Sequence, residues 1–223
     1  LEFIRDDICF QNLNVKVVGM GSGLAWSSLG PSHHTTEDIA VLRAIPNLRI
    51  LSPATPNQVA ACVEEAYHHQ GPVYIRIGMN NEKEFFETDY RVSLSGQDVL
   101  NDKGELVIFT TGSILEEVVE AAKLLEASGI DATVVNTVRI KPFAKEYLLQ
   151  RAAQAKLLVA VEEHNVMGGL GSILAEVLTE HGTGSRLLRI GLQDTFAEGY
   201  SNNQQSVRKQ NDLGAESIAK RVM

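Results

Sequence analysis

The sequence predicts an α/β fold made of two units, each with a parallel sheet covered by helices. Short apolar segments alternate with amphipathic segments through residues 15–78, and the same alternation resumes at residue 104. Strands and helices that alternate in this way form parallel sheets. The 223 residues are 44% hydrophobic and 22% charged, which is ordinary for a globular protein and enough for two small cores.

The first unit is predicted to begin with a strand at 15–19, where the apolar run VKVVG ends in glycine. The segment TTEDIAVLRAI (35–45) places threonine and acidic residues before apolar residues at helical spacing, which predicts a capped helix that Pro46 ends. LRILSP and PVYIRIG predict two further strands. TPNQVAACVEEAYHH predicts the helix between them, with proline in its first turn.

Residues 79–104 are polar, charged and rich in turn residues, which predicts a linker at 81–103 between units at 1–80 and 104–223. The expected strands of the second unit are ELVIFTTG, DATVVNTVRIKP, KLLVAVEEH and RLLRIGL. The expected helices are SILEEVVEAAKLLEASG, AKEYLLQRAAQA, GGLGSILAEVLTEHG and, near the end, AESIAKRV. Gly129 is expected to close the first of these helices.

Composition narrows the class of protein. The net charge of -8, without a run of lysine and arginine, argues against nucleic-acid binding. No apolar stretch is long enough to cross a membrane, and the N-terminus does not read as a signal peptide. Cys9 and Cys62 lack metal-type spacing, so we expect a reducing, cytoplasmic setting and no metal site. LEFIRDDICF reads as the last part of a helix, so we expect a longer polypeptide.

Two histidines lie at the predicted carboxyl end of the first strand, where open α/β sheets bind ligands. His33 and His34 follow Gly30-Pro31-Ser32. An imidazole there could donate to a substrate oxygen or move a proton near neutral pH, but a local surface role is equally compatible with the residues alone. Neighbouring residues of an extended loop point in different directions, so we expect only one of the two to face a given ligand.

Arg76 lies inside an apolar strand, near its carboxyl end. A buried guanidinium must meet an anion or a set of carbonyl groups, because an unpaired buried charge is costly. That anion could be a phosphate or carboxylate of a substrate, or an acidic neighbour in a structural ion pair. The residue type and position leave both open.

The segment VEEHNVMGGLGS (161–172) places two carboxylates and an imidazole at the end of a strand, followed by a glycine-rich turn into a helix. The glycines could let backbone N–H groups approach an anion, although glycines at such junctions more often serve tight packing. Glu162 and Glu163 are expected either at a subunit interface or on a solvated strand end. The usual nucleotide, metal and nucleophile motifs are absent.

The segment GPSHHTTEDIAVLRAIPNLRILSPATPNQV resembles the transketolase family of thiamin-diphosphate enzymes. GPVYIRIG resembles the next strand of the family's pyrimidine-binding domain. VVNTVRIKPF, LLVAVEEHNVMGGLGSILAEVL and IGLQDTFAEGY resemble its C-terminal domain. The resemblance implies that 1–80 is the latter part of the pyrimidine-binding domain and that 104–223 is the transketolase C-terminal domain.

The resemblance also implies roles for single residues. His33 matches the family's loop histidine beside the thiazolium, so its expected role is catalytic: it polarises the substrate carbonyl or handles its proton. His34 replaces the usual glutamine and is expected to bind substrate. Arg76 matches the arginine that grips the substrate's phosphate. Gly21 and Leu29 stand where family members carry histidine and aspartate, which puts the ordinary pentose-phosphate substrates in doubt.

The family's catalytic glutamate and its magnesium and diphosphate motif are not found in the sequence. Thiamin diphosphate and Mg²⁺ are therefore expected to be held mostly by residues outside this chain. The implied partner is an N-terminal section or subunit with the diphosphate-binding domain, in a homo- or heterodimer.

The leading hypothesis is an enzyme of carbohydrate metabolism that transfers a two-carbon ketol unit between sugar-type substrates. A deoxyxylulose-phosphate-synthase-like enzyme, a 2-oxoacid dehydrogenase β subunit and a non-catalytic dimerisation module are the alternatives.

Overall fold

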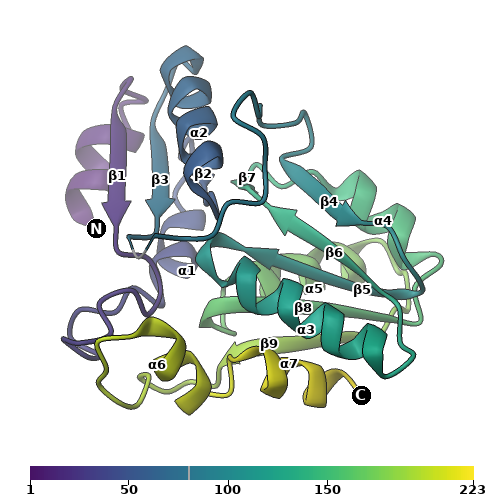
Figure 1. Ribbon diagram of the computed structural model, residues 1–223. Helices are drawn as coiled ribbons and strands as arrows, with labels where there is room; N and C mark the ends of the chain where they lie inside the picture. Colours follow the sequence, from purple (N-terminus) through teal and green to yellow (C-terminus); the bar gives the residue numbers. More distant parts are fainter. Residues whose placement is uncertain (80) are drawn as a thin grey trace.

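The computed structural model describes residues 1–79 and 81–223, which form two sheets and the helices that cover them (Figure 1). The first part of the chain contains η1 (Phe3–Cys9), β1 (Lys16–Met20), α1 (Asp38–Arg43), β2 (Arg49–Leu51), α2 (Pro56–His68) and β3 (Val73–Ile77). The second part contains β4 (Gln97–Asn101), β5 (Leu106–Thr111), η2 (Gly112–Ile114), α3 (Leu115–Ala127), β6 (Ala132–Thr137), β7 (Arg139–Lys141), α4 (Lys145–Ala152), β8 (Leu157–Asn165), α5 (Leu170–Glu180), β9 (Leu187–Leu192), α6 (Gln204–Gln210) and α7 (Ala215–Val222).

The first sheet has the strand order β1-β3-β2-β7, and β3 pairs in parallel with both β1 and β2. Strand β7 comes from the second part of the chain and pairs antiparallel with β2. The prediction of a single strand over 131–142 is therefore wrong in detail. The segment divides at Val138 into β6 and β7, which belong to different sheets. At this crossing Ser52 N donates to Val138 O at 2.7 Å, so backbone hydrogen bonds join the two units.

The second sheet has the order β4-β6-β5-β8-β9, in which β4 alone is antiparallel. Strand β4 lies within the stretch predicted as the linker 81–103, and it pairs with β6, so this sheet begins at Gln97. The predicted fold class, two α/β units with mainly parallel sheets, is confirmed. The domain limits at 80 and 104 stay a prediction.

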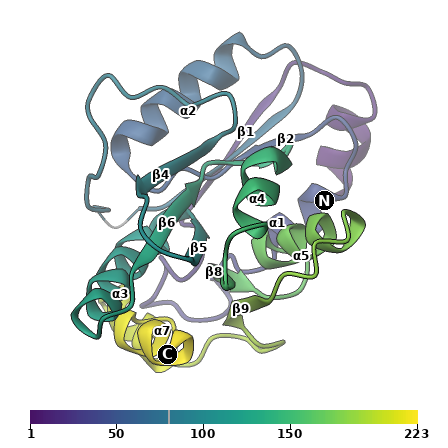
Figure 2. The ribbon, with the colours of Figure 1, turned by 90° about the vertical axis from the view of Figure 1, so that its right-hand side faces the viewer.

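Alternate residues of the second sheet face helices on opposite sides, as expected for parallel strands that are buried on both faces. Ile108 and Val134 belong to a core that includes α3 and α7, whereas Val107 and Phe109 pack with α4 and α5 (Figure 2). The second of these cores also contains Ile39 of α1. The hydrophobic interior is therefore continuous between the two units.

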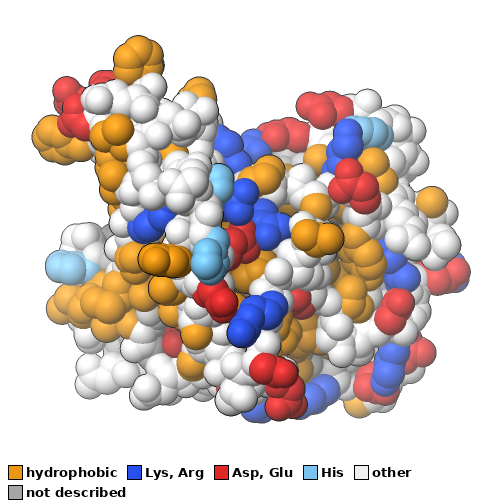
Figure 3. All heavy atoms as spheres, turned by 90° about the horizontal axis from the view of Figure 1, so that it is seen from above, with side chains coloured by type: hydrophobic (Ala, Val, Ile, Leu, Met, Phe, Trp, Pro, Cys, Tyr) orange, Lys and Arg blue, Asp and Glu red, His pale blue; other side chains and the backbone are white. Residues whose placement is uncertain are grey.

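Strand β1 is an edge of the first sheet in the described part of the chain. Val18 is 54% exposed and Met20 is 62% exposed, and Tyr67 on α2 is exposed as well. Seen from above, hydrophobic side chains gather on the side of the first unit (Figure 3). Among the described residues, no helix has the length and apolar character needed to cross a membrane.

Two local predictions were incomplete. Helix α1 begins as expected, but its N-cap is Glu37 and no side chain caps it; the Thr36 hydroxyl donates to the Glu37 carboxylate instead, at 2.6 Å. Helix α6 was not predicted, because its sequence QQSVRKQ lacks a clear apolar period. It begins where the Asn203 side chain accepts a hydrogen bond from Gln205 N.

Candidate functional site

The loop that carries the two histidines is fixed by contacts at both ends. Gly23 and Thr35 exchange two backbone hydrogen bonds, of 3.0 and 2.9 Å. Gly30 has a positive φ of 76°, and a Cβ there would lie 2.1 Å from a ring carbon of Tyr200. Only glycine allows this close approach, so the second unit helps to position a loop that belongs to the first.

The two histidines of this loop differ in environment. His33 is exposed, and its Nδ1 lies 3.0 Å from the Ser32 hydroxyl, whereas its Nε2 has no partner in the described part of the chain. His34 is half-buried, and neither of its ring nitrogens has a hydrogen-bond partner among the described residues. Burial lowers the pKa of the His34 imidazole, although Glu163 and Glu37 oppose the shift. The loop thus presents one solvated imidazole and one neutral imidazole with unused hydrogen-bonding capacity.

Arg76 is only 1% exposed and lies directly beneath this loop. Its Nε donates to both carboxylate oxygens of Asp38, at 3.1 and 2.9 Å. Its Nη2 donates to Thr35 O at 3.0 Å and to Glu163 O at 3.2 Å. This is the structural ion pair that the sequence left open as an alternative, and it ties the loop, α1 and the end of β8 together. Contact between Arg76 and a substrate stays a prediction.

Glu162, at the end of β8, is completely buried. Its carboxylate accepts hydrogen bonds from Leu170 N at 2.7 Å and Gly171 N at 2.9 Å, at the start of α5. A Cβ on Gly169 would lie 1.9 Å from the Glu162 carboxylate. The glycines therefore serve packing, and the hydrogen-bond acceptor at this helix start is the chain's own Glu162 carboxyl group. Burial raises the pKa of Glu162 to about 7, against the lowering effect of the two N–H groups.

Glu163 points to the opposite side of β8 and is only 2% exposed. It accepts from Arg208 Nε at 3.0 Å and Arg208 Nη2 at 2.9 Å, and also from Gln204 and Ser113. Burial alone would raise the pKa of Glu163, but the Arg208 guanidinium holds it below its usual range. A solvated strand end, which the sequence left open for both glutamates, is therefore wrong, because each carboxylate is enclosed by donors.

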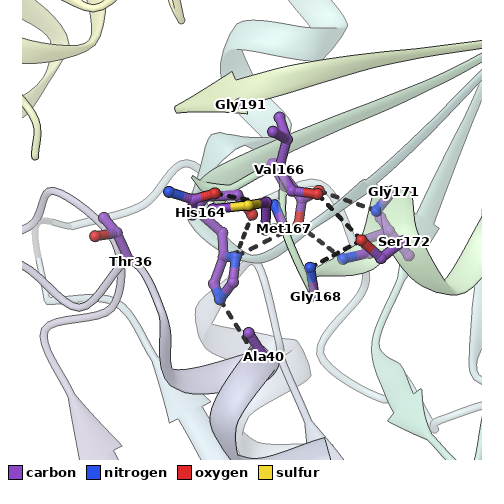
Figure 4. Close-up of polar contacts among 12 residues, drawn as sticks. Thr36, Ala40, His164, Val166, Met167, Gly168, Gly171, Ser172 and Gly191 are labelled. Carbon is purple, nitrogen blue, oxygen red and sulfur yellow. Dashed lines mark hydrogen bonds and ion pairs between the residues drawn. The ribbon is translucent and has the colours of Figure 1, made fainter. Parts of the chain in front are cut away.

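His164 continues the same strand and is 1% exposed. Its Nδ1 lies 2.6 Å from Asn165 O, and its Nε2 lies 3.4 Å from Ala40 N of α1 (Figure 4). Asn165 N donates to Thr36 O at 2.8 Å. Burial, together with Arg76, lowers the pKa of His164. The turn between β8 and α5 is thus a docking element between the units, and its imidazole has partners on both sides.

Sequence reasoning misses two charged groups of this junction, Asp38 and Arg208. Asp38 stands out in the sequence only as an acidic residue in a first helical turn, although an arginine inside the neighbouring strand is a signal that a buried carboxylate is needed. Arg208 lies in a polar segment that carries no such signal. The described residues contain no group of three or more histidine, cysteine or acidic side chains placed to hold a metal ion.

The residues present fit thiamin diphosphate only in part. The loop offers an unpartnered, partly buried imidazole at His34 and a solvated one at His33. No set of carboxylate ligands for a magnesium diphosphate group is found in the described part of the chain. These residues could therefore face such a cofactor but would leave its metal to other residues.

Comparison with known proteins agrees with the two-unit architecture. The transketolase pyrimidine binding domain matches residues 2–83, and the transketolase C-terminal domain matches residues 97–216. A subunit of the apulose-4-phosphate transketolase of Actinobacillus succinogenes is 37% identical over 219 residues, which cover 97% of this chain and 70% of that protein.

Solved structures give the same result. A structure described as a split gene transketolase, inactive beta4 tetramer, has a TM-score of 0.89 and 36% identity, and covers 99% of this chain and 70% of its own. A transketolase mutant from Pichia stipitis has a TM-score of 0.76, covers 96% of this chain and 30% of its own, and shares the fold at 22% identity. The chain belongs to the transketolase family and is related to subunits of split transketolase-type transferases.

Proposed function

We propose that this chain is the part of a two-chain transketolase-type enzyme that brings His33 to a sugar-type substrate during transfer of a two-carbon ketol unit. The observation that carries the proposal is the His33–His34 loop itself. It is held firmly at both ends, yet His33 Nε2 and both His34 nitrogens have no partner in the described part of the chain. Polar groups that a fold leaves unpartnered at a fixed position are suited to bind a ligand.

When bound, thiamin diphosphate would supply the carbanion that attacks the substrate carbonyl. In this proposal His33 Nε2 donates a proton to the substrate oxygen, or accepts one from it, while the Ser32 hydroxyl holds Nδ1. His34 remains neutral because burial lowers its pKa, so it can donate through one nitrogen and accept through the other. Mg²⁺ and the diphosphate group are held by the partner.

Two observations support a partner that carries the diphosphate-binding domain. The relatives include a protein named as one subunit of a transketolase and a structure named a split gene transketolase. Strand β1 is an edge in the described part of the chain, with Val18 and Met20 exposed beside the histidine loop. An apolar sheet edge of this kind suits further packing, by a preceding part of the pyrimidine-binding domain or by a partner. We propose a cytoplasmic homo- or heterodimer.

The substrate class proposed here is a ketose with an anionic end. One relative is named for apulose 4-phosphate, and another, from Clostridium sp., for 6-deoxy-6-sulfo-D-fructose. A substrate-binding role for Arg76 would require its guanidinium to leave Asp38. We therefore rank this role below a supporting one, in which Arg76 holds the floor of the histidine loop.

Reconstitution tests the proposal. The full protein that contains this chain is assayed for ketol transfer in three mixtures: alone, with the subunit that carries the diphosphate-binding domain, and with both proteins in the absence of Mg²⁺. We expect turnover only in the complete mixture. Activity of this chain without the partner, or a complete mixture that transfers no ketol unit from any phosphorylated or sulfonated ketose, would overturn it.

A deoxyxylulose-phosphate-synthase-like activity is the second candidate. The segment DTFAEGY favours it, and 1-deoxy-D-xylulose-5-phosphate synthase 2 of Geobacter sulfurreducens is 33% identical over 220 residues, which cover 35% of that protein. Such an enzyme takes its two-carbon unit from a 2-oxoacid. Release of CO₂ from pyruvate by the reconstituted enzyme, in place of ketol transfer, would select this candidate.

A further inference from the structure

A polar cleft of about 460 Å³ opens where three segments meet: the exit of β3, the start of α3 and the start of α6. Its lining includes Met79 and Glu82 from the first segment, Ser113 and Glu116 from the second, and Gln205 from the third. None of these residues has a role in the proposed ketol transfer. The cleft has the size of a small-molecule site, although such sites are usually more apolar.

The floor of this cleft is formed by the buried network around Glu163. Arg208 is 4% exposed and Ser113 is 6% exposed, and both bind the Glu163 carboxylate. Arg208 Nη2 also donates to the Ser113 hydroxyl at 3.0 Å. With Nε and Nη2 engaged, Arg208 Nη1 has no hydrogen-bond acceptor in the described part of the chain. The floor is therefore preformed and retains unused N–H donors.

The walls add amides and carboxylates. Asn81, Asn202 and Gln205 are exposed amides that can both donate and accept, and Glu82 and Glu116 contribute carboxylates. A hydroxyl group also donates and accepts, so a ligand with several hydroxyl groups can satisfy amides, carboxylates and the guanidinium together. An apolar ligand would cover these polar groups and offer them no hydrogen bonds, which is costly.

Charge excludes a phosphorylated ligand from the same cleft. Arg208 is neutralised by Glu163 in a buried ion pair, and the other charged residues of the described lining, Glu82 and Glu116, are both acidic. A phosphate or sulfonate would meet like charges. We infer that the cleft binds an uncharged, polyhydroxylated ligand, such as a sugar or sugar alcohol, at the junction of the two units.

The test compares two probes that cannot undergo ketol cleavage: a hexitol and its 6-phosphate. Binding to the full protein is measured calorimetrically, without partner subunit or cofactor, so the result does not depend on ketol transfer. We expect the hexitol to bind roughly tenfold or more tightly than its phosphate. Glu116→Gln should reduce this preference about threefold, and Gln205→Ala should weaken hexitol binding about two- to tenfold.

Glu120→Gln is the matched control, because Glu120 lies about one turn farther along α3 and outside this cleft. It should change neither affinity, and unchanged melting temperatures should show that all three variants fold. Equal or tighter binding of the phosphate would overturn the charge argument. The absence of saturable hexitol binding at high millimolar concentration, or an equal effect of Glu120→Gln, would remove the site altogether.

Discussion

The His33–His34 loop and the turn between β8 and α5 are similar in sequence and opposite in structure. Both follow a parallel strand, and both combine histidine with glycine. In the turn, Glu162, Glu163 and His164 are buried and each polar group has a partner. In the loop, one imidazole is exposed and the other has no partner in the described part of the chain.

The two regions differ in how much hydrogen-bonding capacity the fold leaves unused. Five hydrogen bonds from Ser113, Gln204 and Arg208 converge on the Glu163 carboxylate, so little capacity is left there for a ligand. The histidine loop has fixed ends, but three of its four ring nitrogens have no partner among the described residues. A rigid position with unused donors and acceptors is what a binding group needs, because order is then established before the ligand arrives.

The largest expected effect is a loss of activity when the histidine loop is changed. His33→Ala in the reconstituted enzyme should lower kcat by roughly ten- to ten-thousand-fold, the range for a positioned proton-handling group. The melting temperature should change little, because His33 is exposed. His68→Ala, at an exposed histidine of α2, is the control and should retain full turnover. Near-normal kcat in His33→Ala would remove this residue from the site.

The next effect concerns Arg76, which connects the two regions. Arg76→Ala leaves the Asp38 carboxylate without its buried cation, which should cost roughly 3–5 kcal/mol of unfolding free energy. Because Arg76 no longer supports the loop through Thr35 O, turnover of substrates with and without an anionic group should fall by the same factor. Chemical denaturation and paired kinetics measure both quantities. Arg91→Ala, at an exposed pair with Glu64, should cost less than about 1 kcal/mol.

The substrate-binding role predicted for Arg76 gives the opposite pattern. The variant would then lose about ten- to a hundred-fold in kcat/KM on the anionic substrate only, with its melting temperature preserved. Arg76→Lys sharpens the comparison, since an ammonium can pair with Asp38 but cannot reproduce the guanidinium fork that also reaches Thr35 O and Glu163 O.

The raised pKa of Glu162 predicts that the free energy of unfolding depends on pH. Its pKa is raised to about 7 in the folded protein, above the usual value of a glutamate, so the folded state binds a proton more tightly than the unfolded state. The stabilisation is complete below about pH 4.5 and is lost as the pH rises to about 7, a change of roughly 3 kcal/mol. Denaturation of wild type and Glu162→Gln across this range measures it. A variant with the same pH dependence as wild type would contradict this assignment.

Much of the fold could be predicted from sequence, because its strands are apolar runs ended by glycine or proline. The strand at 15–19 and the helix opened by Pro56 are found close to their predicted limits. Two features could not be predicted. The division at Val138 depends on which sheet has a free edge, and β4 lies in a polar segment that becomes a strand only by pairing with β6.

The site was predictable to a smaller extent. Residue type and strand position pointed to His33, His34 and Arg76, but the choice between ligand and structural partner for Arg76 depended on Asp38, whose approach is set by tertiary packing. The ion pair of Glu163 with Arg208 joins residues 45 positions apart, and no local sequence pattern indicates it.

The smallest effect tests whether the β8–α5 turn is structural throughout. The Ser172 hydroxyl accepts from Gly168 N at 2.8 Å and donates to Val166 O at 3.1 Å, and so closes the turn (Figure 4). Ser172→Ala removes both bonds and a longer one, of 3.5 Å, that Ser172 accepts from Arg189 Nη1. Because the position is half-buried, water can replace part of them, so we expect a loss of about 1 kcal/mol. Ser128→Ala, at an exposed helix end, should cost less than about 0.5 kcal/mol. The kcat of Ser172→Ala should equal that of wild type, because the turn only docks the units. A large loss of kcat with unchanged stability would move this turn into the functional site and end the contrast with the histidine loop.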